Sequence, residues 1–87
     1  MQTPRSNNAS CVNGSKIFFV GGRDSNQALL NSLEWYDLVS GERSELHKVL
    51  ERPIEFPLVG RISEAEIAIL GGMNDRGACD DLAIYNF

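Results

Sequence analysis

Two short apolar segments of the chain, 50 residues apart, each end in a pair of glycines. The first is KIFFVGG, residues 16–22, and the second is EIAILGG, residues 66–72. Continuous apolar runs of four residues bounded by glycine are typical of strands buried on both faces. Paired glycines indicate a positive φ or a close approach of another segment, where a Cβ would not fit. The pattern predicts two equivalent strands that end at Gly21, Gly22, Gly71 and Gly72.

A second pair of matching segments follows the glycines. LEWYD, residues 33–37, matches LAIYN, residues 82–86, at an offset of 49, and Tyr36 matches Tyr85. Their aromatic and branched residues favour strands. Neighbouring strand residues point to opposite faces, so Trp35 and Tyr36 are expected to pack on the two sides of one sheet. An internal period near 50 residues indicates repeat architecture.

The remaining segments supply partner strands. Asn13-Gly14 is a strong hairpin signal in the first copy, and a turn at Ser63-Glu64 holds the corresponding place in the second. In the first copy, the turn at residues 39–42 leads towards a fourth strand. The expected strands are residues 9–12, 17–20, 33–37, 56–62, 66–70 and 82–86.

Residues 42–51, ERSELHKVLE, leave two alternatives open. Leu46, Val49 and Leu50 recur at helical spacing, and Pro53 would end such a helix. The same segment stands where the fourth strand and the loop to the next unit are expected. If it is helical, the first unit lacks its outer strand.

A strand ending in a glycine pair, a polar loop and a strand ending in Tyr-Asp resemble the kelch repeat. Pro4-Arg5 resembles the Pro-Arg that commonly opens such repeats. Families with this pattern fold as β-propellers, in which a repeat of roughly 50 residues forms one four-stranded blade. The resemblance implies an all-β fold of kelch-type antiparallel blades, a partial β-propeller. Residues 1–52 are then the first repeat, and residues 53–87 are a second, incomplete repeat.

The chain departs from the kelch pattern at two points. Kelch repeats usually carry a Trp a few residues beyond the Tyr-Asp pair, where this chain has Arg43, and the second copy ends at Phe87 before that position. A closed propeller needs about four to eight blades, and repeat units do not bury their faces alone. We therefore expect either a piece of a longer propeller or several chains that assemble to close a ring.

Charge and cysteine usage narrow the function classes. The net charge is −4 with no cluster of Lys or Arg, which argues against nucleic acid or an anionic membrane as partner. No apolar run approaches the roughly 18 residues of a membrane span. Cys11 and Cys79 lack metal or redox spacing, and His47 is the only histidine, so we expect no metal and no cofactor. Free thiols and the lack of a signal peptide indicate a cytoplasmic protein.

The polar loops that follow the glycine pairs are the best candidates for a binding face. The kelch resemblance implies that they project from the same face of adjacent blades, and that ligand contacts follow the glycine pair and the Pro-Arg pair. Arg23 offers a planar fork suited to a partner's carboxylate. The candidate ligand-binding or partner-binding residues are Ser6, Asn7, Arg23, Asp24, Asn74, Asp75 and Arg76.

The resemblance implies a non-enzymatic protein-interaction module that binds a protein partner. Two alternatives stay open. The chain is an architectural subunit whose incomplete blade is finished by a partner's strand or by self-association, because unpaired edges favour strand addition. Otherwise it is a fragment of a propeller oxidase, a class whose copper site needs several ligands that one histidine does not provide.

Overall fold

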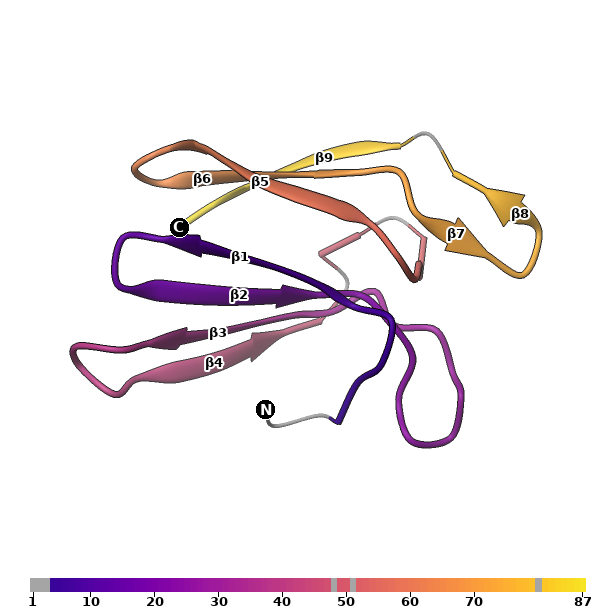
Figure 1. Cartoon of the computed structure of the whole chain (residues 1–87), viewed down its shortest axis with the longest axis horizontal. Helices are drawn as coiled ribbons and strands as arrows, with labels where there is room; N and C mark the ends of the chain where they lie inside the picture. Colours follow the sequence, from indigo (N-terminus) through magenta and orange to yellow (C-terminus); the bar gives the residue numbers. More distant parts are fainter. Residues whose placement is uncertain (1–3, 48, 51, 80) are drawn as a thin grey trace.

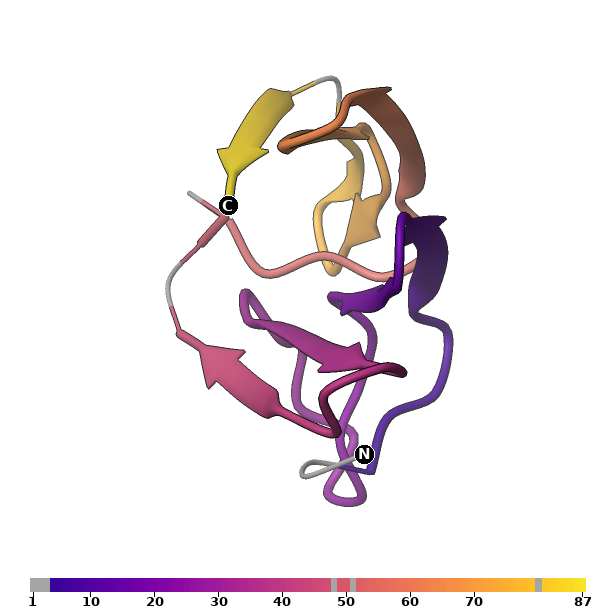
Figure 2. The same ribbon diagram turned by 90° about the vertical axis from the view of Figure 1, so that its left-hand side faces the viewer.

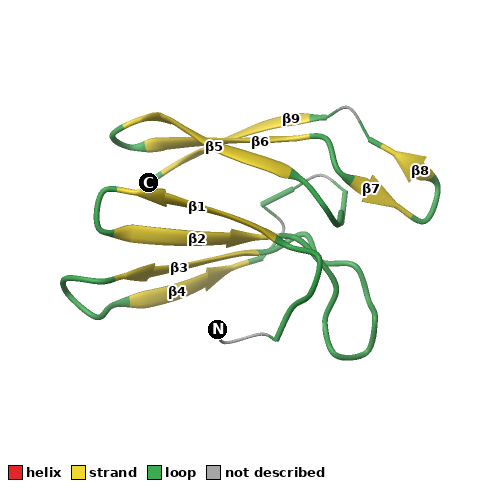
Figure 3. Cartoon of the chain, in the orientation of Figure 1, coloured by secondary structure: helices red, strands yellow, loops and turns green. Residues whose placement is uncertain are grey.

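The computed structural model describes residues 4–47, 49–50, 52–79 and 81–87, which contain β-strands and loops and no helix (Figures 1 and 3). The nine strands are β1 (Ala9–Asn13), β2 (Lys16–Val20), β3 (Leu33–Asp37), β4 (Arg43–Leu46), β5 (Leu58–Ser63), β6 (Glu66–Leu70), β7 (Met73–Asn74), β8 (Gly77–Ala78) and β9 (Leu82–Asn86). The first sheet has the order β1-β2-β3-β4, the second has the order β5-β6-β9, and β7 pairs with β8; every pairing is antiparallel. The expected all-β fold is confirmed.

The first hairpin turns one residue later than the sequence predicted. Asn13 is still part of the β1–β2 ladder, and the turn residues are Gly14 and Ser15. Gly14 has φ +63°, which suits a two-residue hairpin turn with glycine first. The buried amide of Asn13 donates to the carbonyl oxygens of Ser63 at 2.8 Å and Glu66 at 3.3 Å. Asn13 therefore ties the two sheets together instead of making the turn.

The third strand is confirmed as β3, and the next element is strand β4, not a helix. The carboxylate of Asp37 accepts hydrogen bonds from two backbone N–H groups of the intervening turn, at 2.9 and 3.1 Å. The turn brings β4 beside β3, with Leu46 opposite Leu33. The helical alternative for residues 42–51 is therefore wrong where the structure describes that segment; residues 48 and 51 lie outside the described part.

The second sheet confirms two of its three expected strands without change. β6 and β9 have the predicted bounds, whereas β5 begins at Leu58 and not at Phe56, and its turn is Glu64-Ala65. Phe56 has φ +55°, which is incompatible with a strand, and its N–H donates to the carbonyl oxygen of Asn7 at 2.7 Å. The contact with the N-terminal segment thus delays the strand by two residues.

The two sheets lie closest together at β1 and β5 and diverge towards β4 and β9. β1 lies beside β5, whereas β4 and β9 are separated by the connection that follows β4 (Figure 2). The wedge between the sheets holds one hydrophobic core. Its buried members are Phe18, Val20, Leu33, Leu50, Ile54, Ile67 and Ile69.

The expectation of burial on both faces is wrong for β6, which is buried on one face only, whereas in β2 the opposite face is half-buried. In β6, Ile67 and Ile69 are buried against the first sheet, but Leu70 on the opposite face is 44% exposed. The reason is that no described element covers the outer face of the second sheet. The rings of Trp35 and Tyr36 lie on opposite sides of β3 as predicted: Trp35 packs against the core, and Tyr36 makes an edge contact with Phe19.

All four paired glycines have positive φ, as the sequence predicted, with values of +66°, +93°, +72° and +98° in chain order. A Cβ on Gly21 would lie 2.7 Å from the carbonyl oxygen of Ile54, and the N–H of Gly22 donates to that same oxygen at 2.7 Å. The first glycine pair is therefore the place where the connection to the second sheet docks. At Gly71 the nearest atom to a Cβ is the carbonyl oxygen of Cys79, at 3.4 Å.

No helix in the described residues is long and apolar enough to cross a membrane.

Candidate binding face

The loops after the two glycine pairs lie at the same end of the two sheets, away from the hairpin turns of β1–β2 and β5–β6 (Figure 1). The first loop is irregular, whereas the second contains the short hairpin of β7 and β8, which the sequence did not predict. We call this end of the molecule the loop face, and it contains the seven candidates Ser6, Asn7, Arg23, Asp24, Asn74, Asp75 and Arg76.

Arg23 is the centre of the loop face because it joins three segments. Its Nε donates to Glu55 at 2.6 Å, its Nη2 donates to Asp75 at 3.0 Å, and its Nη1 donates to the carbonyl oxygen of Gln27 at 2.8 Å. The hydrogen bonds that Arg23 donates to Glu55, and then to Asp75, raise the pKa of Arg23 further above its ordinary value. The guanidinium fork predicted for a partner's carboxylate is thus engaged by carboxylates of the chain itself.

Glu55 is the functional neighbour that sequence reasoning missed. Its carboxylate is largely buried, and it accepts bonds from both Arg23 and the side-chain amide of Asn7, the latter at 3.0 Å. Asn7 has φ +57°, a left-handed conformation that Asn tolerates better than most residues. The repeat spacing could have identified Glu55. Pro53 follows Pro4 by 49 residues, so Glu55 is equivalent to the candidate residue Ser6.

The backbone positions the two loops in the same way. Ser6 and Arg23 exchange two backbone hydrogen bonds of 2.9 and 2.8 Å, and Glu55 and Met73 exchange two of 2.8 Å. In each copy, the residue that follows the glycine pair is thereby fixed to the segment that precedes the first strand. This equivalence explains why both loops leave the sheets at one end.

Two of the candidates shape their own loops. The carboxylate of Asp24 accepts hydrogen bonds from the N–H groups of Asn26 at 2.8 Å and Ala28 at 3.0 Å, which closes the first loop. The side-chain oxygen of Asn74 accepts the N–H of Arg76 at 2.9 Å within the β7–β8 turn. Each side chain therefore holds its own loop through hydrogen bonds to the backbone.

Two shallow hollows border the Arg23–Asp75 ion pair. One, of about 250 Å³, is lined by Ser6, Arg23 and Asp24 among others, and the second, of about 320 Å³, is lined by Asn74, Asp75 and Arg76 with Pro53 beside them. The ion pair stands between the hollows because each contributes one of its partners. Asp75 is 79% exposed, and Arg76 is also exposed with no ion pair to other described residues. These two side chains are the most accessible charges of the loop face.

Beneath the loop face, Arg5 is completely buried in a polar network of the first sheet. Its Nε donates to Glu34 at 2.7 Å, and Glu34 is itself fully buried. Its Nη2 donates to the hydroxyl of Ser32 at 2.9 Å and to Glu45 at 3.3 Å, and its Nη1 donates to the carbonyl oxygen of Gly21 at 2.8 Å. Arg5 therefore links the N-terminal segment, the glycine pair and the outer strands of the sheet.

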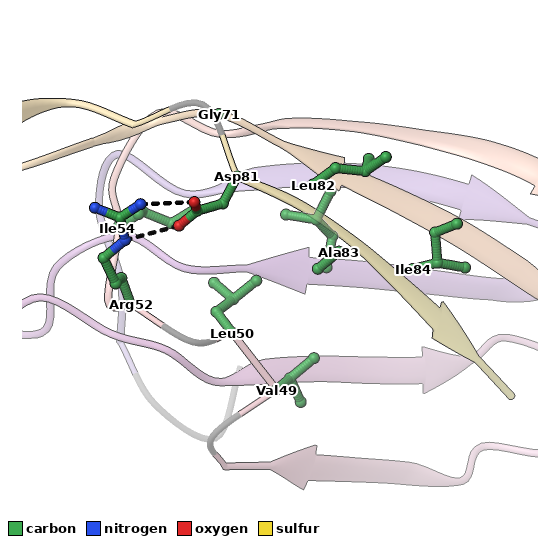
Figure 4. Close-up of a pocket in the computed structure, with 10 residues that line it drawn as sticks. Val49, Leu50, Arg52, Ile54, Gly71, Asp81, Leu82, Ala83 and Ile84 are labelled. Atoms are coloured by element: carbon green, nitrogen blue, oxygen red, sulfur yellow. Dashed lines mark hydrogen bonds and ion pairs between the residues drawn. The ribbon is translucent and has the colours of Figure 1, made fainter.

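The equivalent place in the second sheet is a pocket between the two sheets, lined by aliphatic side chains together with Arg52 and Asp81 (Figure 4). The pocket has a volume of about 350 Å³, and Arg52 and Asp81 close one side with two hydrogen bonds of 2.7 and 2.6 Å. The bonds from Arg52 lower the pKa of the Asp81 carboxyl. The apolar lining consists of Val49, Leu50, Ile54, Ile69, Leu82, Ala83 and Ile84.

The described residues show no metal-binding arrangement. No three His, Cys, Asp or Glu side chains among them gather into a group that could hold a metal ion. Cys11 and Cys79 are both free and half-buried, and burial raises the pKa of the Cys11 thiol.

The comparisons with known proteins identify the first sheet. The family model of the kelch motif matches residues 4–46, a segment that runs from Pro4 through the first glycine pair to the end of β4. A search of curated proteins found no match to the chain. Kelch motifs build β-propeller blades that generally mediate protein interactions without catalysis, and the blade of this chain is part of a propeller that is not closed here. Residues 4–46 are a kelch motif, and the match supports a kelch-repeat fragment in this part of the chain.

Proposed function

We propose that the chain is a non-enzymatic protein-interaction module that binds a protein partner through the loop face. One observation carries the proposal: the Arg23–Asp75 ion pair of 3.0 Å joins the two post-glycine loops, which are 52 residues apart in the sequence. A rigid repeat scaffold that presents adjoining loops at one end is the usual form of a repeat-protein binding surface. In this proposal residues 1–52 are the first repeat, and residues 53–87 are a second, incomplete one.

The accessible charges indicate how the partner makes contact. Asp75 is far more exposed than Glu55, so a carboxylate of the partner is expected to replace Asp75 on Arg23 and leave the bond to Glu55 intact. Arg76 offers a second planar cation at the edge of the same hollow. The partner surface that fits this arrangement is acidic and extended over both loops. A cytoplasmic location, where the two cysteines stay reduced, belongs to the same proposal.

The test compares two variants at opposite ends of the molecule. Purified wild-type chain, a loop variant with Arg76→Ala and a Glu64→Ala variant serve as baits for a cell extract, and bound proteins are quantified by mass spectrometry. Glu64 lies in the β5–β6 turn, away from the loop face, and is the matched control. We expect a stoichiometric partner that Glu64→Ala retains and the loop variant loses. Retention by the loop variant with loss by Glu64→Ala would contradict the proposal.

A further inference from the structure

Asn13 joins the two sheets at the end of the molecule opposite the loop face, where the β1–β2 and β5–β6 hairpins turn (Figure 1). We call this end the turn end. Asn13 is only 3% exposed. Its Nδ2 donates to the carbonyl oxygen of Ser63 at 2.8 Å and to that of Glu66 at 3.3 Å. One side-chain amide of the first sheet therefore binds both strands of the neighbouring hairpin.

The residue that follows Asn13 makes this amide chemically reactive. Asn13-Gly14 is the only Asn-Gly pair in the sequence. Because glycine has no Cβ, its backbone nitrogen approaches the side chain of the preceding asparagine with little steric hindrance. Gly14 is exposed, and a Cβ built on it would meet no atom within 4 Å. The nucleophile thus belongs to an exposed residue, whereas the amide that it would attack is buried.

The reaction open to this pair is deamidation, and water is its only co-reactant. The backbone nitrogen of Gly14 attacks Cγ of Asn13, which forms a cyclic succinimide as the bond from Cγ to Nδ2 breaks. The departing nitrogen takes the proton that Gly14 loses and leaves as ammonia. Water then adds to either carbonyl of the ring and opens it. The product has aspartate or isoaspartate at position 13, and nothing is oxidised or reduced.

The contact between the sheets opposes this reaction. Attack requires Cγ of Asn13 to turn towards Gly14, but two hydrogen bonds hold the amide against the second sheet. Asn13 is also paired with Lys16 in the β1–β2 ladder, and closing the ring requires its backbone to leave that ladder. Burial further keeps water away from the side chain. Deamidation in the folded chain therefore proceeds through a local opening of the turn end.

The product does not restore the contact. An ionised carboxylate accepts hydrogen bonds but donates none. The atoms that bind Asn13 in the second sheet are both carbonyl oxygens, which also only accept. A carboxylate returned to this position would be buried without a donor, which is unfavourable. Isoaspartate in addition lengthens the main chain within the β1–β2 ladder.

The loop-face end of the inter-sheet contact is held by different groups. The N–H of Gly22 donates to the carbonyl oxygen of Ile54 at 2.7 Å, and the N–H of Phe56 donates to that of Asn7 at 2.7 Å. Gly22 follows the end of β2, whereas Asn13 pairs with the first residue of that strand. Loss of the Asn13 amide is therefore expected to loosen the turn end and leave the loop-face end in place.

We propose that Asn13 is a deamidation site guarded by the inter-sheet contact, and that its deamidation keeps the turn end open. Opening of the turn end sets the rate of the reaction, so the amount of product records how often the two sheets separate there. The product differs from the original chain by a negative charge at position 13. This site is independent of the loop face and of any partner bound there.

The first test compares the full 87-residue chain with a synthetic peptide of residues 12–16, VNGSK, whose ends are blocked. Both are incubated at the same neutral pH and temperature, and peptide mapping by mass spectrometry measures aspartate and isoaspartate at position 13. We expect the peptide to react about tenfold faster or more, because the chain must first open locally. Equal rates would overturn the guarding role of the contact.

Urea provides the control for the chemistry, because it removes the contact between the sheets. In urea the chain is expected to react as fast as the peptide in the same solvent. Gly14→Ala is expected to slow the reaction severalfold under these conditions, since its methyl group hinders the attacking nitrogen. A chain that does not deamidate at position 13 in urea, or a Gly14→Ala variant as fast as wild type, would overturn the assignment of this site.

The second test examines the product through amide hydrogen exchange. Asn13→Asp reproduces one product, and Asn26→Asp makes the same change in the exposed loop after the first glycine pair. We expect Asn13→Asp to speed exchange beside the β1–β2 and β5–β6 turns while the amides of Gly22 and Phe56 stay protected. Asn26→Asp should leave the turn end unchanged.

Two outcomes of this exchange experiment contradict the proposal. Unchanged protection at the turn end of Asn13→Asp would show that the carboxylate does not keep it open. Equal loss of protection at both ends would show general destabilisation in place of local opening. If Asn13→Asp does not fold, wild-type chain that has been partly deamidated by incubation decides, because ion exchange separates the product by its added charge and both fractions are measured.

Discussion

The three strands of the second sheet are arranged like the first three strands of the first sheet, and both sheets have a glycine pair, but equivalent positions hold opposite chemistry. In the first sheet Arg5 and Glu34 form a fully buried ion pair of 2.7 Å. In the second sheet Ile54 and Ala83 occupy those places and line a pocket together with Arg52 and Asp81. The strands nevertheless pair in matching register. The register of the repeat therefore does not depend on the buried ion pair.

The comparison extends to the outer faces. The second sheet leaves more apolar surface exposed, and its register lines up Leu58, Leu70 and Leu82 across all three strands. Contiguous exposed apolar surface of this kind is typical of an interaction site. In the first sheet the equivalent positions, Val20 and Leu33, are buried in the core between the two sheets. The same positions of the repeat are therefore buried in the first sheet and exposed in the second.

The largest expected effect comes from breaking the buried pair of the first sheet. Glu34→Ala leaves Arg5 buried without its principal carboxylate, which typically costs about 3–5 kcal/mol of unfolding free energy. The double variant Arg5→Ile, Glu34→Ala copies the chemistry of the second sheet and is expected to recover at least half of that loss. Urea denaturation followed by circular dichroism measures both. If the double variant is less stable than Glu34→Ala, the two sheets do not tolerate interchange of these positions.

The next effect distinguishes the two glycine pairs. Gly21→Ala is expected to cost about 3 kcal/mol, because its Cβ would meet the carbonyl oxygen of Ile54 at 2.7 Å as well as adopt a positive φ. Gly71→Ala is expected to cost about 1–2 kcal/mol, since its Cβ has only an ordinary contact with Cys79 at 3.4 Å. The same denaturation experiment compares them. If the two substitutions lower the free energy of unfolding equally, the positive φ alone accounts for both losses and the contact with Ile54 does not contribute.

The smallest effect concerns acid stability. The N–H groups of Ser40 and Val39 lower the pKa of Asp37 in the first sheet, and Arg52 lowers the pKa of Asp81 in the second. Because each folded-state pKa lies below the ordinary value of 3.8, each carboxylate stabilises the fold above that pH, and the contribution is lost as the pH falls through the folded pKa.

Asp37→Asn and Asp81→Asn should each flatten the loss of stability between about pH 5 and pH 2. Added salt should weaken only the Asp81 contribution, because an exposed ion pair is screened whereas backbone hydrogen bonds are not. Denaturation midpoints at low and high ionic strength measure the difference. A salt-independent contribution from Asp81 would show that its bond to Arg52 is not the cause.

Local sequence features predicted most strands and all four glycine conformations. β3, β6 and β9 have the expected bounds, because apolar runs and glycines constrain the backbone within a few residues. The errors arose where a distant segment intervenes. Asn13 was expected in the turn, but its side chain donates a hydrogen bond to the other sheet. Phe56 was expected in a strand, but its N–H donates to the carbonyl oxygen of Asn7. A hydrogen bond between residues about 50 positions apart cannot be predicted from the local pattern of apolar and polar residues.

The candidate binding face was predictable in position and only partly in chemistry. The repeat period places both post-glycine loops at one end, and the structure brings Arg23 and Asp75 together there. Glu55 was not found because it lies in the connection before β5 and not in a loop that follows a glycine pair, although the spacing of Pro4 and Pro53 aligns it with Ser6. The kelch motif model matches residues 4–46, a range that contains the Pro-Arg, glycine and Tyr-Asp positions of the resemblance.

The sequence by itself determined the repeat, the strands and the glycine conformations, because these depend on side-chain periodicity and local backbone sterics. Only the tertiary structure decided that Arg23 is bound by Glu55 and Asp75, and that Arg5 is buried with Glu34 while Ile54 and Ala83 leave a pocket. These contacts join segments that are about 30 to 50 residues apart. Which residues meet in these contacts depends on how one sheet packs against the next. That packing is known only once the chain is folded.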